Sequence, residues 1–169
     1  VLESAGGGSF LVLPLEKVGR VDLNAPKVAG HKQEVLDIAW NPFDDNIIAS
    51  SSEDATVKVW QIPEDGLVEN LTKPLLTLEG VHQRRIGIVA WNPVAANILL
   101  SASHDHIICI WNLETQEAVS EIRVHQDIIY SVSWNHNGSL IATTCKDKQL
   151  RIIDPRSGEI KQEGKCHEG

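Results

Sequence analysis

Short apolar segments and polar segments alternate along most of this chain. The apolar segments are four to six residues long, are rich in Val, Ile, Thr and Trp, and are bounded by Asn, Asp, Pro and Gly. This pattern is typical of β-strands separated by turns, and no stretch shows the roughly 3.6-residue period of a helix. We predict strands at residues 35–40, 47–51, 56–61, 75–78, 86–91, 98–103, 107–112, 118–122, 129–134, 140–144, 149–153 and 159–162.

The predicted strands fall into a repeat marked by histidine, aspartate and tryptophan. In two copies, a histidine is followed after 23 positions by an aspartate and after 6 more by a tryptophan, and a further tryptophan stands 9 positions after the histidine: His31, Trp40, Asp54 and Trp60, then His82, Trp91, Asp105 and Trp111. Such a repeat is typical of the blades of a β-propeller, each a four-stranded antiparallel sheet. We therefore predict an all-β fold of WD-repeat blades.

A third copy of the repeat is degenerate. It keeps His125, Trp134 and Asp147 in the same order, but its first turn is one residue shorter and Ile153 replaces the last tryptophan. A fourth copy begins at His167. We predict blades at 30–79, 80–123 and 124–165, the end of a preceding blade and its connection at 1–29, and the start of the next blade at 166–169. Because propellers have about four to eight blades, we expect an incomplete piece of a larger ring.

Repeated polar side chains predict a structural network at one end of each blade. A hydroxyl residue stands four positions before each repeat aspartate, so aspartate, histidine, hydroxyl and indole N–H can form a buried chain of hydrogen bonds that fixes the loops. The predicted members are His31, Ser50, Asp54 and Trp60 in the first copy, His82, Ser101, Asp105 and Trp111 in the second, and His125, Thr143 and Asp147 in the third.

The same residue types also occur in hydrolase triads. A catalytic site is needed once, whereas this set recurs at fixed spacing, and the sequence has no Gly-x-Ser-x-Gly nucleophile motif. We therefore predict that the protein is not an enzyme. His104 and His106 flank Asp105 and suggest a metal site, but two histidines in a turn lack the further ligands that zinc needs. We expect no metal and no cofactor.

Composition and charge exclude several classes of function. Hydrophobic residues make up 42% of the chain, and the formal net charge of −8 disfavours general nucleic-acid binding. No apolar run reaches the roughly 18 residues of a membrane span, and the N-terminal residues do not read as a signal peptide. Three cysteines without a Cys-x-x-Cys pair favour a reducing cytoplasm. We expect Cys109 to be buried and Cys145, near a turn, to be exposed.

Four stretches of the chain resemble one family, the coronins: GGSFLVLPL (residues 7–15), VLDIAWNP (35–42), RIGIVAWNP (85–93) and RIIDPR (151–156). The Ile153-Asp154 pair in place of Trp-Asp also fits the coronin pattern. The resemblance implies a seven-bladed propeller, of which this chain would cover about blades two to four, that binds actin filaments of the cytoplasmic cytoskeleton. It also implies contact with the branched-actin nucleating complex and oligomerisation through a coiled coil, both through regions outside this chain.

A strip of cations marks a candidate actin-binding surface. Loops after each repeat histidine and turns around each repeat aspartate share one rim, which carries Lys32, Arg84, Arg85, Lys146 and Lys148. Such a strip on an acidic chain can steer an acidic filament, and adjacent arginines can reach two carboxylates. The alternative is that these are ordinary solvated loop charges. A generic WD-repeat scaffold in trafficking or signalling is the alternative function.

Overall fold

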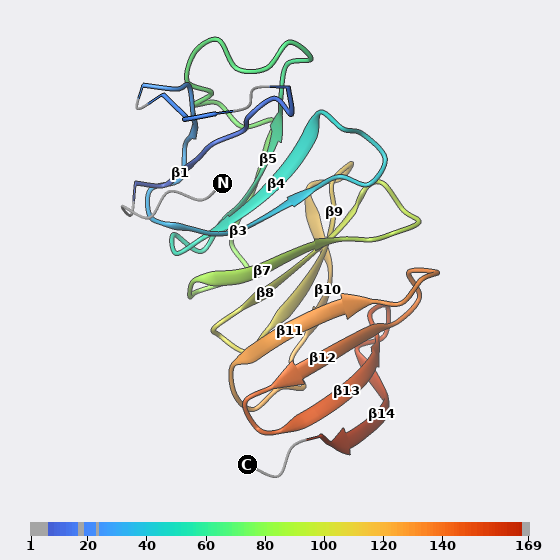
Figure 1. Cartoon of the computed structure of the whole chain (residues 1–169). Coiled ribbons are helices and arrows are strands. Elements are labelled where there is room, and N and C mark those ends of the chain that lie inside the picture. The colour runs from blue at the N-terminus through green and yellow to red at the C-terminus, as the bar shows by residue number, and fades with distance from the viewer. Residues whose placement is uncertain (1–6, 17–18, 23, 167–169) are drawn as a thin grey trace.

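The computed structural model describes residues 7–16, 19–22 and 24–166, which form strands, turns and bends but no helix, and therefore no helix that could cross a membrane. Three four-stranded antiparallel sheets follow one another along the chain, preceded by a two-stranded sheet. In Figure 1 they succeed one another from the N-terminal to the C-terminal part of the chain. The predicted all-β architecture of four-stranded antiparallel sheets is confirmed. The repeat start predicted at His167 lies outside the described residues.

Each four-stranded sheet is built from consecutive strands in sequence order. The first sheet contains β3 (Val35–Trp40), β4 (Ile47–Ser52), β5 (Val57–Gln61) and β6 (Leu76–Leu78); the second contains β7 (Ile86–Trp91), β8 (Ile98–Ser103), β9 (Ile108–Asn112) and β10 (Glu117–Ile122); the third contains β11 (Ile129–Trp134), β12 (Ile141–Cys145), β13 (Gln149–Asp154) and β14 (Glu159–Lys165). Each boundary lies within one residue of its prediction, except that β14 extends three residues further.

The two-stranded sheet pairs β1 (Ser9–Phe10) with β2 (Val28–Ala29). The pairing is antiparallel, as it is between the third and fourth strands of the complete sheets. This is the segment for which the sequence predicts the end of a preceding blade. Immediately after β2, a Cβ atom at Gly30 would stand 2.6 Å from Cη2 of Trp60, so only glycine lets the backbone pass so close to that ring.

The hydrophobic core lies between successive sheets rather than inside any one of them. Side chains alternate between the two faces of a strand, so each sheet can pack on the sheet before it and on the sheet after it. The first core cluster joins Phe10 and Val28 of the two-stranded sheet to Val35, Ile48 and Trp60 of the first sheet. The second joins Val57, Val59 and Leu78 to Ile86, Leu99 and Trp111, and the third joins Leu100, Ile108 and Ile122 to Ile129, Ile141 and Ile153.

Hydrogen bonds between the first strands add to this packing. The indole N–H of Trp91 donates to the carbonyl of Ala39 at 2.9 Å, and that of Trp134 donates to the carbonyl of Ala90 at 3.4 Å. These bonds tie β7 to β3 and β11 to β7, which lie next to one another in Figure 1. Trp91 and Trp134 therefore fix the relative position of neighbouring sheets, whereas Trp40, which ends β3, is 48% exposed.

Candidate functional site

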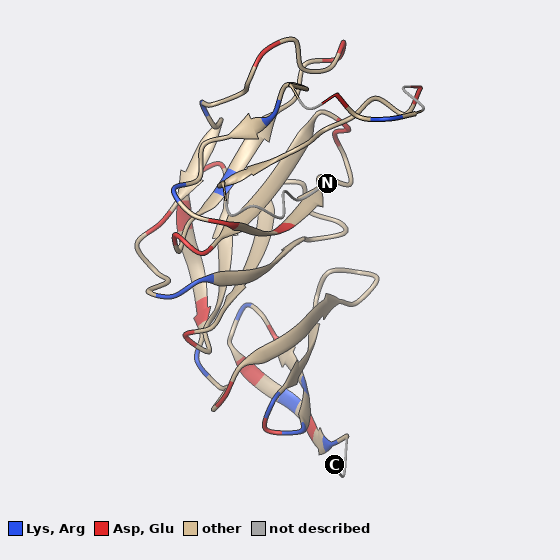
Figure 2. Cartoon of the chain, turned by 60° about the vertical axis from the view of Figure 1, so that its left-hand side comes forward, with Lys and Arg blue, Asp and Glu red and all other residues tan. Residues whose placement is uncertain are grey.

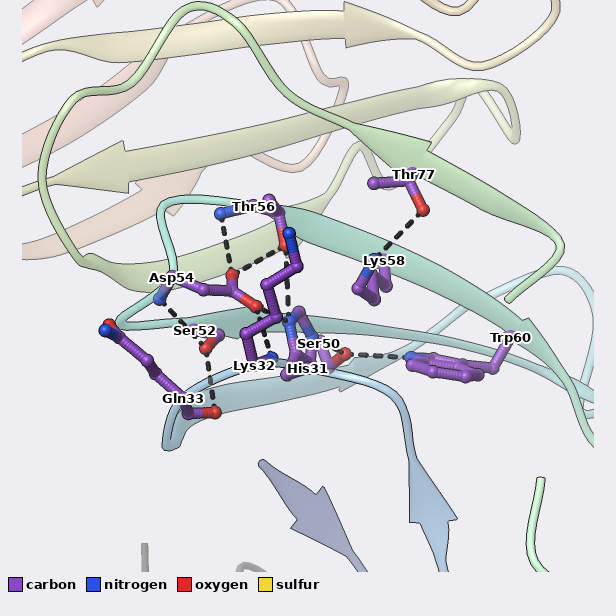
Figure 3. Close-up of polar contacts among 10 residues, drawn as sticks. All are labelled: His31, Lys32, Gln33, Ser50, Ser52, Asp54, Thr56, Lys58, Trp60 and Thr77. Atoms are coloured by element: carbon purple, nitrogen blue, oxygen red, sulfur yellow. Dashed lines mark hydrogen bonds and ion pairs between the residues drawn. The ribbon is translucent and has the colours of Figure 1, made fainter. Parts of the chain in front are cut away.

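The first copy of the polar network is complete (Figure 3). His31 Nδ1 lies 3.1 Å from Asp54 Oδ2, and His31 Nε2 lies 2.7 Å from Ser50 Oγ. Trp60 Nε1–H donates to the same Ser50 oxygen at 2.8 Å. The hydrogen-bond order assigns the proton of the ring: Nδ1–H donates to the carboxylate, while Nε2 accepts the serine hydroxyl proton. The chain of hydrogen bonds therefore extends from the buried indole of Trp60 to Asp54 in the turn after β4.

Asp54 is the member of this network that organises the loops. Its carboxylate accepts hydrogen bonds from the Lys32 amide at 2.9 Å and from the Thr56 hydroxyl at 2.7 Å, in addition to the bond from His31. Burial by itself would raise the pKa of Asp54, but these donors hold it well below its usual range. One ionised side chain thus joins the loop before β3 to the turn between β4 and β5.

The second copy repeats this geometry in the second sheet. His82 Nδ1 lies 3.1 Å from Asp105 Oδ2, His82 Nε2 lies 2.8 Å from Ser101 Oγ, and Trp111 Nε1–H donates to Ser101 at 2.8 Å. Burial lowers the pKa of His82 despite the adjacent carboxylate, so the ring is neutral at pH 7. The structure therefore brings together all four predicted members in each of the first two copies.

The third copy differs from the prediction, because Asp147 does not pair with histidine. His125 Nε2 reaches Thr143 Oγ1 at 2.8 Å, but His125 Nδ1 is buried without a hydrogen-bond partner. Asp147 instead accepts a bond from Arg151 Nη2 at 2.7 Å, and Arg151 Nε lies 2.7 Å from Glu163 Oε1. Burial, together with the nearby Arg151 guanidinium, lowers the pKa of His125 to about 4. Asp147 thus pairs with the guanidinium of Arg151 in place of the neutral ring of His125.

The position of Arg151 explains why only the third copy changes. In the three sheets, the residue paired with the network hydroxyl on the neighbouring strand is Lys58, Cys109 or Arg151. Lys58 donates to Thr77, and Cys109 is buried and apolar in character, so neither competes for the repeat aspartate. Arginine at this register position was visible in the sequence and was the signal that could have predicted the exchange.

Nothing in these networks resembles an open catalytic or metal site. In the two complete copies, the histidine and hydroxyl are buried and already bonded to one another. Between His104 and His106, Asp105 is engaged by His82 and by the amides of Gln83 and Ile107. Within the described part of the chain, no group of three or more His, Cys, Asp or Glu side chains is placed to hold a metal ion.

The five predicted rim cations, Lys32, Arg84, Arg85, Lys146 and Lys148, are all exposed. Two of them face acids: Arg85 lies 3.6 Å from Glu53 of the preceding sheet, and Lys146 lies 4.0 Å from Asp127. Among the described residues, the other three rim cations form no ion pair with a side chain. Figure 2 shows basic and acidic segments interleaved along the loops rather than separated into two faces. Of the two rim arginines, Arg84 is therefore the more available to a partner.

The predicted exposure of Cys145 is wrong. Cys145 is buried, and its Sγ lies 3.2 Å from the carbonyl of Asp127. Ser52 and Ser103 occupy the same place in the first two repeats, and their hydroxyls donate to the carbonyls of Gln33 and Arg84. The repeat register carried this signal, because each residue stands two positions after its network hydroxyl. Cys109 is buried, as predicted.

The sequences of the three repeats match one family model. The family model "WD domain, G-beta repeat" matches residues 25–61, 72–112 and 116–154, which together include most of the chain. The chain belongs to the WD40-repeat family. Each match ends one residue after the last tryptophan of a repeat or, in the third copy, one residue after Ile153, which replaces it. The matches therefore include the degenerate copy.

Curated relatives of this chain include coronins. The chain is 56% identical over 168 residues to human coronin-2A, covering 96% of this chain and 32% of the relative, and 58% identical over 166 residues to human coronin-2B, covering 98% and 34%. The crystal structure of the WD40 domain of Toxoplasma gondii coronin superimposes with a TM-score of 0.91 at 34% identity, covering 98% of this chain and 42% of that one. The chain thus spans about a third of the length of its curated relatives, and the predicted coronin-type WD-repeat segment is confirmed.

Proposed function

We propose that this segment is part of a non-enzymatic scaffold that binds actin filaments in the cytoplasm. The observation that supports this proposal most is the similarity to coronins over nearly the whole segment. The chemistry agrees with a binding role, because the geometry repeated in the first two sheets uses their histidines, hydroxyls and aspartates to hold loops in place. Contact with the branched-actin nucleating complex and oligomerisation through a coiled coil belong, in this proposal, to regions outside the segment.

The rim at the histidine end of the sheets is the surface we propose for the filament. Arg84 and Arg85 lie side by side on the loop before β7, Lys32 lies on the corresponding loop before β3, and Lys148 lies in the turn between β12 and β13 of the third sheet. These side chains are exposed on a chain whose net charge is −8, so they are a local attraction for an acidic partner. The Glu53 carboxylate beside Arg85 limits this attraction and leaves Arg84 as the stronger contact.

The test is salt-dependent co-sedimentation of the full-length protein with actin filaments. We expect binding that weakens steeply with salt, and we expect Arg84→Glu with Arg85→Glu to weaken it by about five- to tenfold. The matched control reverses two exposed lysines away from this rim, Lys73→Glu with Lys161→Glu, and should leave binding unchanged. Both variants should melt as the parent does, because exposed charges contribute little to stability.

The outcome also decides between the two functions. A folded full-length protein that does not sediment with filaments would contradict the actin proposal and favour a scaffold for another cytoplasmic assembly. Equal binding by the arginine variant and the lysine variant would keep the filament as partner but remove the Arg84–Arg85 loop from its contact surface.

A further inference from the structure

A groove of about 280 Å³ opens between the second and third sheets, at the end of the sheets opposite to Arg84 and Arg85. One wall comes from the turn after β7 and from strands β9 and β10, and the other comes from the turn after β11 and the turn between β13 and β14. Most of the lining is apolar, with Val94, Ile98, Ile110, Val119, Trp134 and Pro155 contributing side chains. Both walls belong to complete sheets.

Features of the degenerate repeat line this groove. The shortened turn after β11 contains Gly138, whose φ of +67° is one that other residues rarely adopt. The carbonyl of Gly138 accepts a bond from Asn92 Nδ2 at 3.0 Å, and a Cβ atom on Gly138 would lie 2.5 Å from Asn92 Oδ1. The turn after β7 and the turn after β11, which both line the groove, are therefore held in direct contact.

A second departure of this repeat also lines the groove. Pro155 follows Asp154 at the place where the second sheet has Leu113, and Leu113 packs against the core between the first and second sheets. Proline is shorter than leucine and has a fixed φ, so it lines the groove without filling it. Gly138 and Pro155, two positions at which the third copy departs from the repeat, thus both line the cavity beside Trp134.

Strand β10 presents its apolar side chain to this groove through a bulge. The pairing of β10 with β9 shifts register between Ala118 and Ser120, which leaves Val119 as the extra residue. Val119 is 55% exposed and Val94, across the groove, is 59% exposed. Two exposed aliphatic side chains that flank an apolar cavity are the arrangement expected of a contact surface rather than of scattered surface residues.

Charge selects the kind of ligand that fits. Arg156 is the one charged residue among the residues that line the groove, and within the described part of the chain its side chain forms no ion pair. The chain as a whole carries a net charge of −8, so an isolated arginine beside an apolar cavity is a local exception. A carboxylate placed next to an apolar side chain satisfies both features.

We propose that this groove binds an extended peptide of a partner protein, with one large apolar side chain in the cavity and a neighbouring Asp or Glu on Arg156. The volume lies just below the range of about 300–1,000 Å³ typical of small-molecule pockets, which favours one side chain over a cofactor. This site lies at the opposite end of the sheets from the rim proposed for actin, so neither proposal rests on the other.

The experiment uses the full-length protein and a synthetic peptide with fluorescein on its N-terminus, fluorescein-Ala-Glu-Leu-Phe-Glu-Ala-amide, followed by fluorescence anisotropy. We expect saturable binding, weakened about fivefold by Arg156→Glu and at least about tenfold by Val119→Asp. Lys73→Glu reverses an exposed charge elsewhere and should change nothing. Val119 and Arg156 are both exposed, so the variants should keep the parent melting temperature.

Three results would overturn the proposal. The first is no saturable binding up to about 1 mM peptide, the weakest affinity of interest here. The second is equal binding of a peptide in which both glutamates are lysine, because Arg156 would then select nothing. The third is self-association of the protein, seen by sedimentation velocity and abolished by Val119→Asp, because the groove would then hold a second copy of the chain.

Discussion

The second and third sheets share one fold but hold their loops with different chemistry. In the second sheet, a neutral histidine bridges a carboxylate and a serine, and that serine also accepts the indole proton of Trp111. In the third sheet Ile153 replaces the network tryptophan, the histidine keeps one bond, and the carboxylate pairs with Arg151. The comparison teaches that the aspartate is the fixed requirement of the turn, while its partner can be a neutral ring or a permanent cation.

The largest expected effect comes from removing the shared hydroxyl. Ser101→Ala leaves both the Trp111 indole N–H and His82 Nε2 buried without a partner, which we expect to lower the free energy of unfolding by about 3 kcal/mol. Thr143→Val removes one bond only, and we expect a loss of about 1 kcal/mol. Urea unfolding of the full-length protein measures both. Equal losses would show that the indole adds nothing to the network.

The pH dependence of stability should separate the two sheets next. The pKa of His125 is about 4 in the folded protein and about 6.5 when unfolded, so the unfolded state takes up a proton first as the pH falls. This contribution to stability is present above pH 6.5 and is lost between about pH 6.5 and 4, by about 3 kcal/mol.

Urea unfolding at a series of pH values checks this expectation. His125→Gln should flatten the profile between pH 6.5 and 4 more than His82→Gln does, since the nearby Arg151 adds to the burial of His125. The pKa of His82 is also lowered, so the His82 variant is the matched control for a buried repeat histidine. A His125→Gln profile as steep as that of the parent would contradict the assignment.

The smallest effect concerns the bonds between sheets. Trp91→Phe removes a 2.9 Å bond to the first sheet from a buried ring, and we expect a cost of about 1 kcal/mol. Trp134→Phe removes a 3.4 Å bond from a half-buried ring at the next boundary and should cost about half as much. Thermal unfolding compares the two. A larger loss for Trp134 would reverse the ranking of the two boundaries.

Sequence reasoning was strongest where one residue type has one role. The spacing of histidine, aspartate and tryptophan predicted the three sheets, because an antiparallel blade with short turns leaves little freedom in where strands begin. It failed at Asp147, because which of two donors a carboxylate chooses depends on the direction of Arg151 from the adjacent strand. It failed at Cys145 because burial there follows from the position within the repeat, which Ser52 and Ser103 share, and not from nearness to a turn.

The groove beside Trp134 was also beyond reach of the sequence pattern. The shorter turn and the proline at 155 are both visible in the sequence, but they lie in different loops. Only the folded arrangement shows that these loops face the bulge at Val119 across one cavity. Departures from a repeat gain meaning when they gather at one place in space.

The location of the core between sheets has a consequence for how such chains grow. Each of the three core clusters combines side chains from two successive sheets, so none of the clusters is formed by a single sheet. Duplicating one repeat in a gene therefore adds one sheet together with one complete hydrophobic layer, since the new sheet supplies half of that layer and its neighbour supplies the other half. Lengthening by duplication needs no redesigned interior, and a duplicated copy can then diverge at its loops.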